Sequence, residues 1–206
     1  PAGGLWKTTN GGSTWTTNTD NLPVLGVSDI AIDPSNANIM YIATGDGDMG
    51  SLSGMTGSPE GDTKSIGILK STDGGATWNT TGMNWTVTSA KLIRRLVMNP
   101  VYPQELTAAT SDGLWRTLNG GTTWTQVKTG YFMDVEFKPN NSDTLYASTF
   151  AYGNAQIFRS TDYGTTWNAV ATLPGVKRIN LAVTPDWPNL VDALCANTSS
   201  GLAGLW

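Results

Sequence analysis

The 206-residue sequence contains no histidine and a single cysteine, Cys195. The lack of histidine excludes a Ser-His-Asp triad and histidine-based zinc or iron sites from this segment, so acid–base chemistry would need Asp, Glu, Tyr or Lys. One cysteine cannot form a disulfide within the segment, and we expect Cys195 to act as a small buried hydrophobic residue. Charged residues make up only 14% and the net charge is −4, which argues against nucleic-acid binding. No apolar run approaches the roughly 18 residues that a membrane helix needs.

An eight-residue pattern, [ST]-x-[DN]-x-G-x-T-W, occurs four times, at residues 8–15, 71–78, 117–124 and 160–167. An Asp or Asn two residues after a hydroxyl residue can bond backbone N–H groups, and the glycine permits a positive φ. Each copy is therefore predicted to be a hairpin turn that the indole of its tryptophan covers. The residues assigned this structural role are Asn10, Trp15, Asp73, Trp78, Asn119, Trp124, Asp162 and Trp167.

A longer repeat surrounds each octapeptide, and the four tryptophans are 63, 46 and 43 residues apart. Each unit has an apolar run that ends near a proline, then two further short runs, and then the octapeptide. A period of about 40–50 residues with four short strands is typical of a propeller blade. The sequence thus predicts an all-β fold, a β-propeller with four-stranded antiparallel blades. The expected repeats are residues 1–26, 27–90, 91–130, 131–177 and 178–206.

The octapeptides resemble the Asp-box (BNR) repeat propellers, which include sialidases, sortilin-type receptors, family-74 xyloglucanases and secreted bacterial repeat proteins. The resemblance implies a secreted or cell-surface protein with a six- to eight-bladed propeller. The chain opens and closes at the same point of the repeat, so about four blades are expected here and the remaining blades in a missing part of the protein.

The first repeat step is longer than the others because of an insertion at residues 45–65. Long connections in a compact fold are usually either functional or disordered. Carboxylates separated by glycines suit Ca²⁺, although the spacing does not match an EF-hand. A Ca²⁺- or sugar-contacting loop and a merely solvated loop both remain open. The carboxylates concerned are Asp46, Asp48, Glu60 and Asp62.

One polar residue lies five positions before the proline of each first strand, and the residues four and two positions before that proline are apolar. The first strand of a blade is the innermost one, so this polar column is expected at the central channel or its mouth. The column could bind a polar ligand, a peptide or a sugar, or its charges could pair with one another. Its members are Asp29, Arg95, Asp134 and Asn180, with Arg94 and Arg178 close by.

Several aromatic residues outside the octapeptides are expected to be exposed. Trp85 and Tyr131 fall in connections between blades, on the same face as the long insertion, where an aromatic ring could stack on a sugar or pack against the next blade. The other members of this group are Phe132, Tyr152 and Trp187.

Three functions are compatible with these features. The first is a non-catalytic extracellular propeller that binds a protein, a peptide or a glycan. The second is a glycoside hydrolase similar to the family-74 xyloglucanases, in which one catalytic Asp directly follows a Tyr-x-x-Thr strand. Here Gly45 separates Thr44 from Asp46, so Asp46 and Asp48 are only candidates for catalysis. The third is a structural surface or adhesin module. Apart from possible Ca²⁺, no cofactor is expected.

Overall fold

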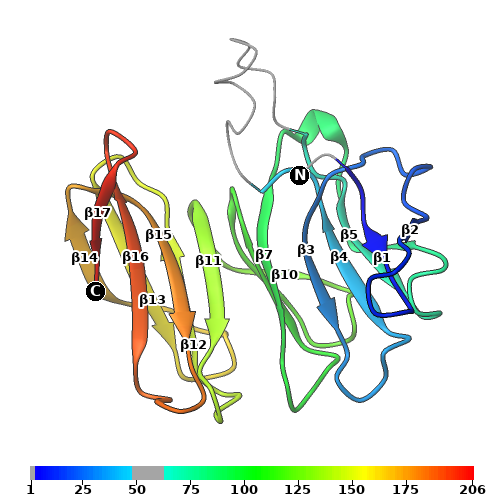
Figure 1. Cartoon of the computed structure of the whole chain (residues 1–206). Helices are drawn as coiled ribbons and strands as arrows, with labels where there is room; N and C mark the ends of the chain where they lie inside the picture. Colours follow the sequence, from blue (N-terminus) through cyan, green and yellow to red (C-terminus); the bar gives the residue numbers. More distant parts are fainter. Residues whose placement is uncertain (1–2, 48–62) are drawn as a thin grey trace. The chain divides into compact units, whose positions relative to one another are not determined.

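A computed structural model of the chain describes residues 3–47 and 63–206 and divides them between two compact units, Pro1–Arg94 and Arg95–Trp206. The first unit opens with a short hairpin of β1 (Trp6–Lys7) and β2 (Thr16–Thr17). A four-stranded antiparallel sheet follows, formed in sequence order by β3 (Val27–Ile32), β4 (Met40–Thr44), β5 (Gly67–Ser71) and β6 (Asn79–Asn84) (Figure 1). The 3₁₀ turn η1 (Val87–Ser89) then leads to β7 (Ile93–Met98), the strand in which the two units meet along the chain.

The second unit repeats the same meander. β7 is the first strand of a sheet with β8 (Leu106–Thr110), β9 (Gly113–Thr117) and β10 (Thr125–Thr129). The next sheet runs β11 (Phe132–Phe137), β12 (Leu145–Thr149), β13 (Asn154–Ser160) and β14 (Asn168–Pro174). A three-stranded sheet of β15 (Val176–Val183), β16 (Val191–Asn197) and β17 (Leu202–Leu205) follows. These sheets have the strand order expected of propeller blades.

The hydrophobic core of the second unit lies between successive sheets. One cluster joins Leu114 of β9 to Phe132, Leu145 and Phe158 of the next sheet. A second cluster joins Ala155 of β13 to residues of β15 and β16, which include Ile179 and Cys195. The innermost strand β11 contacts both β8 and β15. Face-to-face packing of sheets through apolar side chains is what holds neighbouring blades together.

The four octapeptides form turns with a common hydrogen-bond pattern. In the copy at 71–78, the Ser71 hydroxyl donates to Asp73 Oδ1 over 2.7 Å and accepts the Gly75 N–H at 2.8 Å. Asp73 Oδ1 also accepts the Thr77 N–H at 2.8 Å. Gly75 has φ of +85°, which only glycine adopts without strain. The side chains of the pattern therefore fix the turn locally.

The two aspartates of these turns are held in their charged form. The hydrogen bond from the Thr77 hydroxyl is the main reason that the pKa of Asp73 falls to about 2. Burial acts against ionisation of Asp162, but hydrogen bonds from Thr166 and Ser160 outweigh it and lower the pKa of Asp162 to about 2 as well. The carboxylates are thus fully used by their own turns, and the structural role expected for them suffices to explain their presence.

The tryptophans of the octapeptides differ in burial, although all of them occupy the last position of the same pattern. Trp167 is 6% exposed and packs in the first core cluster, whereas Trp15 is 55% exposed. In both, the indole N–H donates back to a turn carbonyl, of Gly164 and Gly12 respectively. The last strand of each blade begins one residue after the tryptophan, as β10 does at Thr125. The tryptophans accordingly close the turns rather than belonging to the strands.

Candidate functional site

The base of the long insertion is a closed and well-bonded structure. Asp46 is 2% exposed, and its backbone N–H donates to the Thr63 carbonyl at 2.8 Å. The Thr44 hydroxyl donates to the Gly67 carbonyl at 2.7 Å and accepts the Ile66 N–H at 3.0 Å. These bonds join the two ends of the insertion across β4 and β5, and Asp46, the first acidic residue of the insertion, is part of this rigid stem.

Arg94 supports the same stem. Its side chain is 9% exposed and its guanidinium donates to the Gly47 carbonyl. A buried cation that bonds a backbone carbonyl fixes the path of the chain as it leaves β4. Arg94, which the sequence placed beside the polar column, thus fixes the backbone at Gly47.

The calcium hypothesis depends on residues beyond this stem. Asp48, Glu60 and Asp62 lie outside the described residues. Within residues 3–47 and 63–206, no group of three His, Cys, Asp or Glu side chains could hold a metal ion. A Ca²⁺ site in the insertion therefore stays a prediction.

The polar column of the innermost strands contains an ion-pair network in the second unit. Arg95 Nε lies 3.6 Å from Asp134 Oδ1, and its Nη2 donates to Glu136 Oε1. Asp134 also accepts two backbone N–H groups, from Val135 at 2.9 Å and from Leu181 of β15 at 2.7 Å. Asp134 thus links β11 to β15. Its ion pair with Arg95 agrees with one of the two interpretations of the polar column, in which the charges of the column pair with one another.

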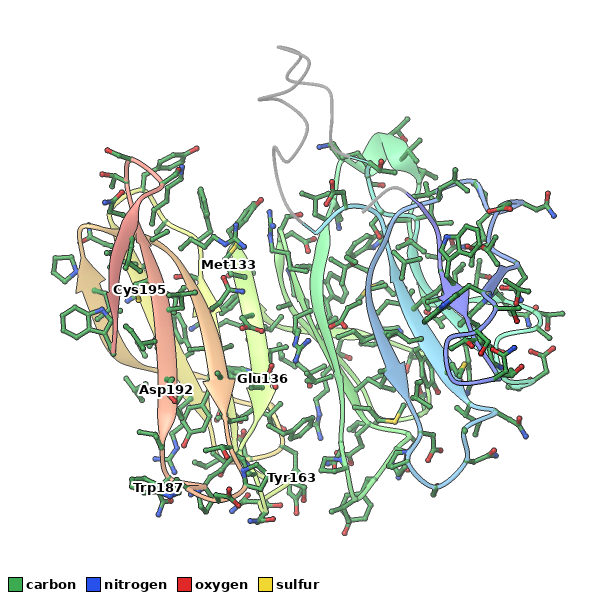
Figure 2. The ribbon with its side chains drawn as sticks, viewed as in Figure 1. Met133, Glu136, Tyr163, Trp187, Asp192 and Cys195 are labelled. Carbon is green, nitrogen blue, oxygen red and sulfur yellow. The ribbon has the colours of Figure 1, made fainter. Side chains whose placement is uncertain are left out.

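Glu136 was not predicted from the sequence to belong to this network. It lies two residues after Asp134 on β11, the strand in which Figure 2 labels it, and the two-residue period of a strand places both on one face. That period was the signal that could have identified it.

The remaining members of the column make local contacts. Asp29 Oδ1 accepts the N–H of the next residue, Ile30, at 2.8 Å, and Arg178 Nε donates to Asn180 Oδ1 at 3.2 Å. The apolar neighbours of Asp29 are not buried as the alternation suggests, because Ile30 and Ile32 are 37% and 45% exposed. Ligand binding by the column as a whole stays a prediction.

The aromatic residues separate into three environments. Trp85 is half-buried, and Lys91 Nζ lies 4.9 Å from its ring centroid. Phe132 is only 1% exposed and packs against Phe158 in the core, so its assignment to the exposed group was wrong; it begins β11 and faces inward. Trp187 is 69% exposed at the end of the second unit where Tyr163 also lies (Figure 2).

Tyr131 and Tyr152 lie together at the other end of the second unit. Both contact Phe150, which the sequence did not single out: the ring centroids of Tyr131 and Phe150 are 5.2 Å apart, and those of Phe150 and Tyr152 are 5.3 Å apart. These residues come from the connections β10–β11 and β12–β13. Because the strands are antiparallel, these connections emerge at the same end of the sheets, at the top of Figure 1.

A further acid, Asp112, occupies the connection that corresponds to the long insertion in the next repeat. Asp112 Oδ1 accepts the Thr110 hydroxyl at 2.7 Å and the indole N–H of Trp115 at 3.0 Å. Asp112 follows Thr110 by two residues, as Asp46 follows Thr44, so the repeat itself was the signal that could have found it. Its bonds give it a structural role in the β8–β9 turn.

Comparison with known proteins identifies the architecture. No family model matches the chain. The xyloglucanase Xgh74A of Acetivibrio thermocellus is 31% identical to it over 186 residues, which cover 75% of this chain. The chain is a propeller segment like those of the family-74 glycoside hydrolases. It spans only 21% of the length of that relative.

Two solved structures support the fold. The GH74 xyloglucanase of Xanthomonas campestris aligns with the whole chain at a TM-score of 0.68 and 20% identity, over 33% of its own length. The GH74 enzyme of Niastella koreensis gives a TM-score of 0.56 and 27% identity, over 84% of this chain and 26% of its own. The all-β propeller fold predicted from the sequence is confirmed.

The relationship is to glycan-degrading enzymes, and it favours the glycoside hydrolase hypothesis over the non-catalytic module that the sequence placed first. As for the membrane, no helix within the described residues is both long and apolar enough to cross one.

Proposed function

We propose that this chain contributes blades to a secreted glycoside hydrolase that cleaves xyloglucan or a related plant glycan. The observation that carries the proposal is the 31% identity to the xyloglucanase Xgh74A across 186 residues. A second xyloglucanase, from Paenibacillus, is 30% identical over 179 residues. Because a polymeric glycan cannot enter a cell intact, such an enzyme would act outside it.

A glycoside hydrolase needs two carboxyl groups that flank the scissile bond, roughly 5–10 Å apart. Asp134 and Glu136 are unsuited to this work. Arg95 contacts both, and Asp134 is committed to two backbone N–H groups, so its charge stabilises the fold. A carboxyl group held in this way is a poor proton donor.

Asp46 is a better candidate for one of the two carboxyl groups. It lies in the stem of the long insertion, one residue further from its Tyr-x-x-Thr strand than the catalytic Asp of the family. The stem bonds of Thr44 and Arg94 would hold it on a rigid support, as catalysis requires. Its partner carboxylate would come from outside the described residues.

The test is an assay of reducing ends released from xyloglucan by the full-length protein and by two variants. Asp46→Asn removes the candidate acid without changing its size, and Asp112→Asn is the matched control in the corresponding connection of the next repeat. Loss of a general acid or base costs about 10²- to 10⁴-fold in rate. We expect that loss for Asp46→Asn and nearly full activity for Asp112→Asn, with both variants folded by circular dichroism.

Equal activity of the two variants would remove Asp46 from the mechanism. No release of reducing ends from any β-linked glucan by the unmodified protein would overturn the hydrolase proposal. Binding of the glycan without release would instead support the second function, a non-catalytic glycan-binding module, which is favoured by the aromatic side chains of Tyr131, Phe150 and Tyr152 at one end of the second unit.

A further inference from the structure

Three aromatic side chains form an open platform at one end of the second unit. Tyr131 and Phe150 are tilted by 51° to each other, and Phe150 and Tyr152 meet edge to face at 84°. Tyr131 and Phe150 are half-buried, whereas Tyr152 is 81% exposed. Tyr131, Phe150 and Tyr152 are called the aromatic platform below. The exposed ring of Tyr152 gives the platform an apolar surface that a ligand can cover.

A lysine from a different sheet lies against this platform. Lys177 Nζ is 5.6 Å from the ring centroid of Phe150 and 5.7 Å from that of Tyr152, and 3.5 Å from Ser200 Oγ. Within residues 3–47 and 63–206, Lys177 forms no ion pair with a carboxylate. The ammonium group is therefore positioned by rings and a hydroxyl but keeps its capacity for an anion.

A β-bulge places Lys177 in this position. Val176 is paired with Asn197 and Arg178 with Ala196, so Lys177 is an extra residue in β15 without a partner of its own on β16. The bulge shifts the alternation of the strand, which allows Val176 and Ile179 both to be buried although they are three residues apart. Bulges of this kind re-aim a side chain.

Backbone hydrogen bonds hold the platform and the lysine together. The Ala151 N–H donates to the Lys177 carbonyl at 2.9 Å, and the Phe150 N–H donates to the Tyr131 carbonyl at 2.9 Å. The Gly175 N–H donates to the Gly153 carbonyl at 2.7 Å. Three separate connections are thus tied to one another. A site that is assembled before the ligand arrives loses less entropy on binding.

We propose that the aromatic platform and Lys177 bind a sugar residue that carries a carboxylate, a uronic acid within a glycan. The apolar face of the sugar ring packs on Tyr152, and its carboxylate pairs with the Lys177 ammonium group. An aromatic surface alone would accept any sugar, whereas the adjacent cation selects an anionic one. The inference takes only the ligand class, a glycan, from the proposed function, and it holds whether or not the protein cleaves that glycan.

The experiment measures binding of trigalacturonate and of its methyl ester by NMR titration of the ¹⁵N-labelled chain. The two probes share the same sugar rings and differ only in their carboxyl groups, which are charged in the acid and are neutral methyl esters in the other probe, and neither measurement requires turnover. A charged hydrogen bond is worth about 1.5–3 kcal/mol, so we expect the acid to bind about tenfold or more tightly than the ester. The preference should weaken as the salt concentration rises.

Three variants separate the two parts of the site. Lys177→Met removes the charge but keeps an unbranched side chain only one atom shorter, and it should abolish the preference for the acid while leaving the affinity for the ester unchanged. Tyr152→Ala, at an exposed position, should lower the affinity for both probes several-fold. Lys138→Met is the control, since it makes the same change in net charge away from the platform. Lys138 follows β11 at the end opposite the platform and donates to Asn189. The affinities of this control should equal those of the unmodified chain.

Equal affinity of the unmodified chain for acid and ester would overturn the proposal. So would the same loss in Lys177→Met and Lys138→Met, because net charge alone would then explain the binding. Failure of xyloglucan hydrolysis with the acid preference intact would count against the proposed function alone. Hydrolysis without any preference for the acid would count against the uronic-acid site alone.

Discussion

The unequal burial of equivalent tryptophans allows a quantitative prediction. Trp167 and Trp15 occupy the same position of the octapeptide, but they are 6% and 55% exposed. A tryptophan buries up to about 250 Å², so Trp167 hides about 235 Å² and Trp15 about 110 Å². At about 25 cal/mol per Å², the two differ by about 3 kcal/mol in the apolar contribution to folding. Residual burial in the unfolded chain lowers both values, and it affects them alike.

Urea unfolding of Trp167→Ala and Trp15→Ala, followed by far-UV circular dichroism, tests this reasoning. Trp167→Ala should lower the free energy of unfolding by about 3–5 kcal/mol, as expected for truncation of a core aromatic residue. Trp15→Ala should cost clearly less. Both variants lose the same indole hydrogen bond to a turn carbonyl, so that this term cancels. Equal losses would mean that the turn, and not packing between sheets, determines what these tryptophans contribute.

Three further predictions concern charged groups and the thiol. Asp73 and Asp162 should titrate near pH 2 by carboxyl NMR, because their pKa is about 2 in the folded chain. A lowered folded-state pKa stabilises the fold above the unfolded pKa, so this stabilisation should be complete above about pH 4 and lost as the pH falls towards 2; titration near pH 4 would contradict the bonded turns. Arg95→Met should lower the free energy of unfolding by about 2 kcal/mol in urea, because it removes the cation 3.6 Å from the buried carboxylate of Asp134, and the half-exposed guanidinium limits the effect; an unchanged midpoint would argue against the network. Cys195 is buried, which raises its pKa, so a thiol reagent should react with it in denaturant but not in buffer; rapid labelling in buffer would show that the core around it is open.

The turns and strands could be predicted because their signals are local. The hydroxyl, the Asp or Asn, and the glycine of each octapeptide bond one another within eight residues, so the pattern contains its own explanation. Burial could not be predicted in the same way. Whether a tryptophan such as Trp15 or Trp167 is covered depends on the neighbouring sheet, and the pattern that the octapeptides share carries no information about that neighbour.

The residues around the candidate sites were predicted only in part, for similar reasons. Tyr152 was correctly placed among the exposed aromatics, but Phe132 was not, because it is one residue past Tyr131 and alternation turns it into the core. Lys177 was not predicted as a site residue because a β-bulge directs it to the platform, and the residues around it contain no signal for a bulge. The Arg95–Asp134 pair joins residues from two sheets, which a column drawn from the sequence could suggest but not establish.

In each of the three four-stranded sheets, the second strand ends in a threonine that closes the following connection, whatever the length of that connection. Thr110 Oγ1 accepts the Gly113 N–H at 3.1 Å, Thr149 Oγ1 accepts the Gln156 N–H at 2.9 Å, and Thr44 Oγ1 accepts the Ile66 N–H at 3.0 Å. The connections between these partners contain two, six and 21 residues. Loop closure becomes only slowly more costly with length, so one clamp can support all three. In the shortest connection, Asp112 bonds Thr110 and Trp115 within the turn itself. The six-residue connection carries Phe150 and Tyr152, and the 21-residue connection carries Asp46. The repeat therefore supplies a fixed stem, and the residues inserted above it are free to change in chemistry without disturbing the blade.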